Sequence, residues 1–101
     1  MKENIIEDLF EVVKNKGELS EKQNILDNDS KVYTKKINLN LKMEDGLTVK
    51  VVALSGFKKD LSDATVRDLR ICTTERNGEW CNSYANQLDE NFLTKIKDEI
   101  L

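Results

Sequence analysis

The sequence predicts a two-layer α+β fold, with a helix at each end of the chain and a four-stranded antiparallel sheet between them. Apolar residues recur at three- and four-residue steps near both termini and alternate with polar residues in the middle. Two glycine turns, at 45–46 and 77–78, divide the middle into two β-hairpins. Because an isolated hairpin is marginal in water, we expect both to join one sheet whose apolar side is covered by the two helices, in a single domain, 1–101.

The first expected helix has its apolar stripe between Ile5 and Val13. Acidic residues occupy its early turns, and Lys14 and Lys16 occupy the last turn, which suits the helix dipole. Gly17 then favours a helix end, because glycine readily takes the left-handed conformation that closes many helices.

Segment 18–31 carries the weakest pattern. Ser20 and Gln23 have the spacing of a capping box, which indicates one short helical turn over 21–26. The polar residues 28–30 then favour a loop.

The first hairpin follows from the alternation between Tyr33 and Met43. A two-residue turn at 45–46 would place a lysine in the apolar face, whereas a three-residue loop over 44–46, with Gly46 left-handed in a bulge, matches apolar to apolar. The sequence therefore predicts the three-residue loop. Its expected pairs are Met43 with Leu47, Leu41 with Val49, and Leu39 with Val51.

The second hairpin follows a linker over 55–64. Here a three-residue loop would oppose Glu75 to Glu79, which costs energy, so a two-residue turn at 77–78 is predicted. Its expected pairs are Arg76 with Glu79, Glu75 with Trp80, and Ile71 with Tyr84. In this register Trp80 and Tyr84 share the apolar face with Leu69 and Ile71.

The last expected helix begins after Asp89, the predicted N-cap, with Leu88 and Leu93 placed as a hydrophobic staple. Its apolar stripe consists of Leu88, Phe92, Leu93, Ile96, Ile100 and Leu101.

Catalytic and metal-binding patterns are missing from the sequence. Without histidine, Ser–His and Cys–His pairs are excluded, and the four glycines form no phosphate-binding motif. Cys72 and Cys81 are too few ligands for structural zinc, and the predicted register places them diagonally on one face, too far apart for a disulfide. Asp60 and Asp63 could contribute to a metal site, but the favoured interpretation is that Ser62 or Asp63 acts as a turn or cap residue. We therefore expect free thiols, no enzyme activity, no cofactor and no metal.

The formal charge of −3 is unevenly distributed. Residues 1–30 contain 4 Lys/Arg and 8 Asp/Glu, whereas residues 31–60 contain 7 and 3. On the predicted sheet the cations fall on the side away from the helices, where they could hold an anionic ligand or an acidic protein surface. The alternative is that these cations only keep a strand surface soluble. The candidate binding residues are Lys36, Lys42, Lys50, Arg70 and Arg76.

Aromatic residues bear on the kind of partner. Trp80 is expected to cover a sheet edge from the apolar side, and becomes an interface anchor if it is exposed. Direct nucleic-acid binding is disfavoured, because Tyr33, Trp80 and Tyr84 are expected on the apolar face, away from the cations, and because the chain has no basic excess. A mirror-image alternative is that Glu3, Glu7 and Glu11 on the first helix occupy a nucleic-acid-binding protein.

These features favour a non-enzymatic protein that acts by stoichiometric binding to another protein, as inhibitors, immunity proteins and phage or plasmid anti-defence proteins do. One alternative is a domain that sequesters an anionic, nucleotide-like small molecule. A second is a structural subunit that self-associates, as a homo-oligomer, through an open sheet edge or through its helices. No apolar run approaches the length of a membrane span, so we expect no membrane partner and a cytoplasmic location.

Overall fold

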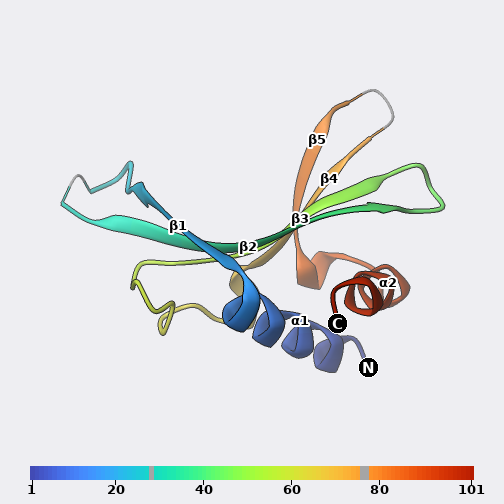
Figure 1. The fold of residues 1–101 in the computed structure, drawn as a ribbon, viewed down its shortest axis with the longest axis horizontal. Coiled ribbons are helices and arrows are strands. Elements are labelled where there is room, and N and C mark those ends of the chain that lie inside the picture. Colours follow the sequence, from blue (N-terminus) through green and yellow to red (C-terminus); the bar gives the residue numbers. More distant parts are fainter. Residues whose placement is uncertain (28, 76–77) are drawn as a thin grey trace.

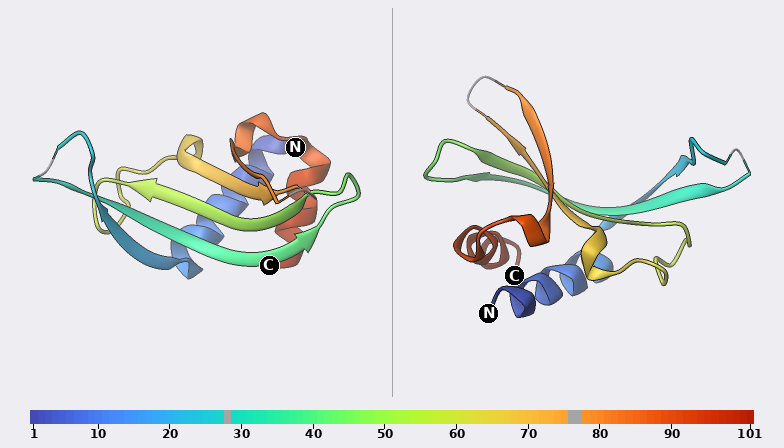
Figure 2. Two further views of the ribbon diagram at one scale, coloured as in Figure 1. Left: turned by 90° about the horizontal axis from the view of Figure 1, so that it is seen from above. Right: turned by 180° about the vertical axis from the view of Figure 1, so that it is seen from behind.

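The computed structural model describes residues 1–27, 29–75 and 78–101. It confirms the α+β fold with both helices on one face of an antiparallel sheet, but the sheet has five strands rather than four, in the order β1-β2-β3-β4-β5 (Figure 1). Two views from other directions show the same two layers (Figure 2). The elements are α1 (Lys2–Lys16), β1 (Glu18–Gln23), β2 (Lys31–Lys42), β3 (Thr48–Gly56), β4 (Leu69–Thr74), β5 (Trp80–Tyr84) and α2 (Glu90–Ile100), with 3₁₀ turns at Val66–Asp68 and Ala85–Gln87.

Helix α1 ends at Gly17 as predicted, but the predicted left-handed conformation is wrong. Gly17 is extended, with φ −67° and ψ 149°, and its N–H donates to the carbonyl oxygen of Val13 at 2.8 Å. A Cβ here would lie 2.4 Å from that oxygen and 2.9 Å from Cβ of Lys35. Glycine is therefore required because the chain passes from helix to strand against β2.

Strand β1 occupies the segment for which a helical turn was predicted. It pairs with the first half of β2, from Glu18 opposite Lys36 to Gln23 opposite Lys31. The hydroxyl of Ser20 donates to the carbonyl oxygen of Thr34 at 3.5 Å, so it does not cap a helix. All residues of β1 are exposed, which explains why its sequence lacks the alternation of a half-buried strand.

The β2–β3 hairpin has the predicted three-residue loop. Gly46 is left-handed, with φ 91°, and the N–H of Met43 donates to the carbonyl oxygen of Leu47 at 2.8 Å. Leu41 pairs with Val49, as predicted. The predicted pairing of Leu39 with Val51 is wrong, because the register shifts at this point and Asn38 opposes Val51. Leu39 nevertheless packs against the core.

The predicted register of the β4–β5 hairpin is wrong by one residue. Thr74 pairs with Trp80, and Arg70 pairs with Tyr84. The N–H of Glu75 donates to the carbonyl oxygen of Glu79 at 3.0 Å, and Gly78 is left-handed, with φ 82°. The expected pair of residue 76 lies outside the described residues. Because side chains alternate along a strand, this shift moves Trp80 and Tyr84 to the side of the sheet opposite the core.

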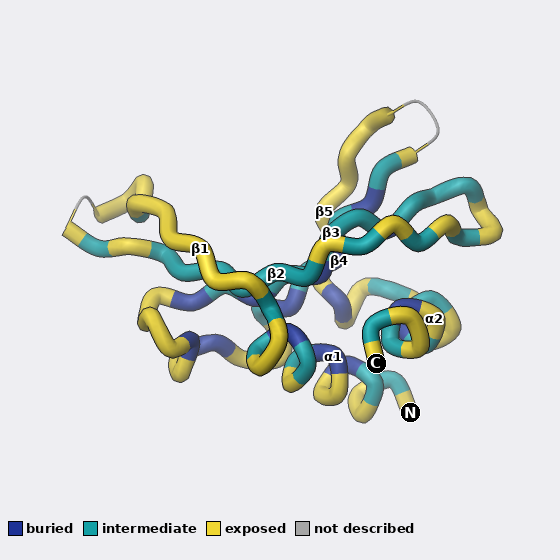
Figure 3. Tube along the Cα trace, viewed as in Figure 1, coloured by how far each residue is buried: buried dark blue, intermediate teal, exposed yellow. Residues whose placement is uncertain are grey.

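The hydrophobic core lies between the helices and the sheet (Figure 3). Leu9 and Val13 of α1 and Leu93 and Ile96 of α2 are buried there, as the two stripes predict, while Leu101 is exposed. The sheet contributes β3 and β4 residues that are fully buried. The fully buried apolar side chains of β3 and β4 are Val49, Val52, Leu54, Leu69 and Ile71.

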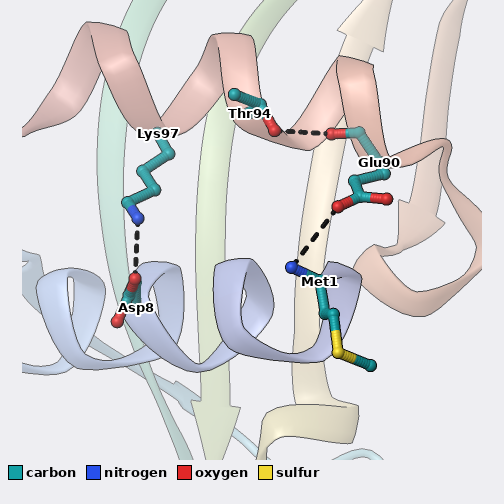
Figure 4. A network of polar contacts seen from close by, with 5 residues as sticks. All are labelled: Met1, Asp8, Glu90, Thr94 and Lys97. Atoms are coloured by element: carbon teal, nitrogen blue, oxygen red, sulfur yellow. Dashed lines mark hydrogen bonds and ion pairs between the residues drawn. The ribbon is translucent and has the colours of Figure 1, made fainter.

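Two ion pairs join the helices at the surface (Figure 4). Nζ of Lys97 lies 2.7 Å from a carboxylate oxygen of Asp8, and the amino group of Met1 lies 3.5 Å from a carboxylate oxygen of Glu90. Asp89 is the N-cap of α2, as predicted, although its side chain makes no capping hydrogen bond. Some of the charged groups at the two helices therefore neutralise each other.

The connection from β3 to β4 is organised by two carboxylates. Asp63 accepts hydrogen bonds from the backbone N–H groups of Phe57 at 2.9 Å and Lys58 at 3.1 Å, and Asp60 accepts one from Ser62 at 3.0 Å. The hydrogen bond from Phe57, aided by that from Lys58, lowers the pKa of Asp63. The prediction that Asp63 is a turn residue is confirmed, and the loop buries Leu61 completely.

Candidate binding face

The side of the sheet away from the helices is not covered by any described element, and we call it the open face (Figure 2, left). Its residues follow from the strand register, because residues opposite each other on antiparallel strands share a face. Its rows are Lys22–Val32, Ser20–Thr34–Ser55, Glu18–Lys36–Ala53–Arg70–Tyr84, Asn38–Val51–Cys72–Asn82 and Lys42–Thr48–Thr74–Trp80.

The sheet is bent about its middle. Strands β1 and β2 on one side of β3, and strands β4 and β5 on the other, turn away from the helices (Figure 1). The floor between them is built by short side chains of β3, namely Val51, Ala53 and Ser55. Lys36 and Arg70 lie on either side of Ala53, so two cations flank this floor.

Arg70 is held in place by Tyr84. Its guanidinium carbon lies 4.9 Å from the centre of the Tyr84 ring, and its Nη2 donates to the Tyr84 hydroxyl at 3.1 Å. Its Nε is buried and has no hydrogen-bond partner among the residues that the structure describes. A buried N–H without an acceptor costs about 1–3 kcal/mol. The free protein therefore leaves the hydrogen-bonding capacity of this guanidinium partly unused.

The charge of the open face is mostly positive and not neutralised within the face. Its rows hold four cations and one carboxylate, that of Glu18. In the described part of the chain none of these four cations forms an ion pair, whereas the ion pairs that do occur involve the helices and the β1–β2 hairpin. The cations are Lys22, Lys36, Lys42 and Arg70.

The structure brings together some of the predicted site residues. Lys36, Lys42 and Arg70 lie on the open face, and Trp80, with 67% of its surface exposed, ends the same row as Lys42. Lys50 lies where the register with β4 shifts, and its Nζ donates to Oδ1 of Asn40 at 2.7 Å. The predicted site residue Arg76 lies outside the described residues.

Sequence reasoning missed the contribution of Tyr84 and of segment 22–32. Tyr84 was assigned to the apolar face through the wrong register. A hollow of about 460 Å³ lies on the open face beside the β1–β2 hairpin, and Lys22, Ile25, Leu26, Val32 and Arg70 are among the residues that line it. The adjacent apolar pair at 25–26, in a segment rich in polar residues, was the available signal for this part of the site.

The two thiols lie on opposite sides of the sheet, not on one face as predicted. Cys72 belongs to the open face, and burial raises the pKa of its thiol. Cys81 pairs with the buried Thr73 and lines a separate hollow of about 240 Å³ on the helix side, near Phe92. Both cysteines are free in this structure.

No protein-family model, curated protein or solved structure matches this chain. Over residues 1–27, 29–75 and 78–101, no cluster of three or more acidic or cysteine side chains is arranged to hold a metal ion. In the same ranges, no helix has the length and apolar character needed to cross a membrane. The open face is therefore interpreted from its own residues.

Proposed function

We propose that this protein is a non-enzymatic binding protein that forms a stoichiometric complex with an acidic surface of another protein through the open face. Inhibitors, immunity proteins and phage or plasmid anti-defence proteins act in this way. One observation carries the proposal: an uncovered sheet face holds four cations that form no ion pair in the described structure. Opposite charge across an interface raises the association rate and selects the partner.

The extent of the face favours a protein over a small ligand. Its cations are spread over three strands, from Lys22 on β1 through Lys36 and Lys42 on β2 to Arg70 on β4. A small anion would contact only one or two of them. Trp80 adds an exposed aromatic side chain at the far end, and tryptophan and arginine are the residue types that most often dominate binding energy at protein interfaces.

Charge reversal tests this proposal. We expect the immobilised protein to capture a partner from a lysate of its native host, saturably and in a fixed ratio. The double variant Lys36→Glu/Arg70→Glu should lose at least about tenfold in affinity, since like charges that face each other across an interface cost several kcal/mol. A matched control, Lys59→Glu/Lys95→Glu, reverses two exposed lysines outside the open face and should bind normally. The absence of any saturable complex, or equal loss in both variants, would contradict the proposal.

An anionic small molecule with a flat ring is the second candidate. The observation that favours it is the pairing of Arg70 with Tyr84, next to the hollow beside the β1–β2 hairpin. Native mass spectrometry of gently purified protein tests it, and a mass increase of a few hundred daltons that disappears on denaturation would support it.

Nucleic acid remains the weaker candidate, although one argument against it no longer holds. Trp80 and Tyr84 lie on the open face and not on the apolar face. The net charge of −3 still opposes binding to a polyanion, because such binders depend on neutralising several phosphates.

A further inference from the structure

The hollow beside the β1–β2 hairpin is lined by different kinds of residue at its two ends. These residues indicate the chemistry of its ligand. Ile25 and Leu26 stand at the hairpin end, with 84% and 94% of their surfaces exposed. Thr34 and Ser55 line the middle, where their hydroxyl groups lie 3.1 Å apart. Arg70 lines the other end. The order across the sheet is therefore an apolar pair with Lys22 beside it, then the two hydroxyl groups, then Arg70.

The apolar end is held in a defined conformation. The backbone N–H of Leu26 donates to Oδ1 of Asn24 at 3.0 Å, and the backbone N–H of Asn24 donates to the carbonyl oxygen of Ser30 at 3.1 Å. Nδ2 of Asn24 also donates to Oγ of Ser30 at 3.2 Å. Two large apolar side chains are thus kept in water by a hydrogen-bonded turn, at a cost that burial against a partner would remove.

From this order we infer that the hollow binds a short acidic segment of the partner protein, with an apolar side chain against Ile25 and Leu26 and a carboxylate on Arg70. This inference rests on the proposed function and names the chemistry of the partner. A guanidinium positioned by an aromatic side chain, as that of Arg70 is by Tyr84, is suited to a carboxylate, because its N–H groups can bind the carboxylate oxygens. The hydroxyl pair lies where the backbone of such a segment would pass and offers it both donors and acceptors.

The distance between the apolar end of the hollow and Arg70 also sets the spacing of the apolar and acidic residues in the partner segment. Val32, beside the apolar end, is four residues along β2 from the row of Arg70 and two strands away from it. With about 3.3 Å per residue and about 4.8 Å per strand, their backbones are about 16 Å apart. An extended peptide covers that distance in about five residues, and the length of the arginine side chain shortens it. The partner segment should carry its acidic residue about three to five positions from its apolar residue.

Selection from random linear peptides displayed on phage tests the inference without knowledge of the natural partner. The full-length wild-type protein is the target, and no variant is used during the selection. We expect the recovered peptides to share an apolar and an acidic residue at this spacing. As synthetic peptides they should lose about tenfold in affinity, equal to about 1.4 kcal/mol, for Leu26→Ser and for Arg70→Gln.

Matched variants and probes make the outcomes distinct. Phe57→Ser, an exposed apolar residue outside the hollow, and Lys95→Gln should bind the peptides normally. Arg70→Lys, which keeps the charge but loses the paired N–H groups, should bind with intermediate affinity. If Arg70→Gln does not fold, the Leu26→Ser variant alone tests the inference. The Leu26 side chain is almost fully exposed, so its replacement should leave the fold intact. Basic or purely apolar peptides, or peptides indifferent to Leu26→Ser, would overturn the inference.

Two further results would also overturn it. Tighter binding of adenosine monophosphate or of an oligothymidylate strand than of any selected peptide would assign the hollow to a nucleotide or a nucleic acid. Self-association that is lost in Leu26→Ser would assign it to a second copy of the chain. If the peptide tests fail but the host partner is still captured, and this capture is sensitive to Lys36→Glu/Arg70→Glu, the inference fails while the proposed function stands.

Discussion

The two glycine-containing hairpins, β2–β3 and β4–β5, have the same closing hydrogen bond, yet the strand pairing next to the turn was predicted correctly only for β2–β3. In each, a left-handed glycine comes directly before the closing pair of residues: Gly46 with φ 91° and Gly78 with φ 82°. In both, the residue before the loop donates its N–H to the carbonyl oxygen of the residue after it. These described closing contacts are alike, so the difference between the hairpins lies in their strands.

Burial specifies the pairing register of the β2–β3 hairpin but not that of the β4–β5 hairpin. Strand β3 has Val49, Val52 and Leu54 fully buried, so a one-residue slip would expose its apolar side chains. Strand β5 is an edge strand in which no residue is buried. Burial therefore does not fix its register, and the opposition of two exposed glutamates is too weak to prevent the closing hydrogen bond from Glu75 to Glu79. The consequence is functional, because it places Trp80 and Tyr84 on the open face.

The largest expected effect is a difference in the free energy of unfolding between a variant at a buried position and one at an exposed position of the second hairpin. Ile71→Ala removes a fully buried side chain of β4 and should lower the free energy of unfolding by about 2–5 kcal/mol. Trp80→Ala should cost less than about 1 kcal/mol, since most of the Trp80 side chain is in water. Urea unfolding measures both. A loss of about 3–5 kcal/mol for Trp80→Ala would instead support the register predicted from sequence, in which Trp80 is buried.

An intermediate effect is expected at the two loop glycines. Gly46→Ala and Gly78→Ala should each cost about 1–2 kcal/mol, because a Cβ is disfavoured at positive φ. A Cβ at Gly78 would meet no atom within 4 Å, so backbone strain alone is measured there. Asparagine, which tolerates this conformation, should cost less at both positions. A Gly78→Ala variant as stable as the wild type in thermal unfolding would show that the second loop has another conformation.

The smallest effect concerns the connection between the hairpins and depends on pH. Hydrogen bonds from Phe57 and Lys58 lower the pKa of Asp63 in the folded state. The stability that they add is therefore complete above the ordinary carboxyl pKa, near 4, and is lost as the pH falls through the lower folded pKa. Asp63→Asn should be less stable than the wild type at neutral pH. Thermal unfolding should show this difference shrinking below about pH 4, and a constant difference would contradict the assignment.

Sequence patterns predicted the parts of the fold that bury apolar side chains. The stripes of α1 and α2 and the alternation of β2 are confirmed, because burial imposes a period on the sequence. Strand β1 was missed and the register of β5 was wrong for one shared reason: both are edge strands without a buried residue. Their contacts depend on neighbours that are distant in sequence, and local patterns do not record these.

The same distinction applies to the candidate site. Lys36, Lys42 and Arg70 could be placed on the open face because each alternates with core residues on its own strand. The contact of Arg70 with Tyr84 could not be predicted, because it depends on the register of an edge strand. The hollow between Leu26 and Arg70 could not be predicted either, because it requires the fifth strand and the turn that β1 forms with β2.

The register of β5 is the central claim, and cross-strand nuclear Overhauser effects measured on isotope-labelled protein test it most directly. We predict contacts between the ring protons of Tyr84 and the side chain of Arg70, and between Trp80 and Thr74. Contacts of Tyr84 with Ile71 and of Trp80 with Glu75 would contradict the account. They would return both aromatic side chains to the core and remove them from the binding face.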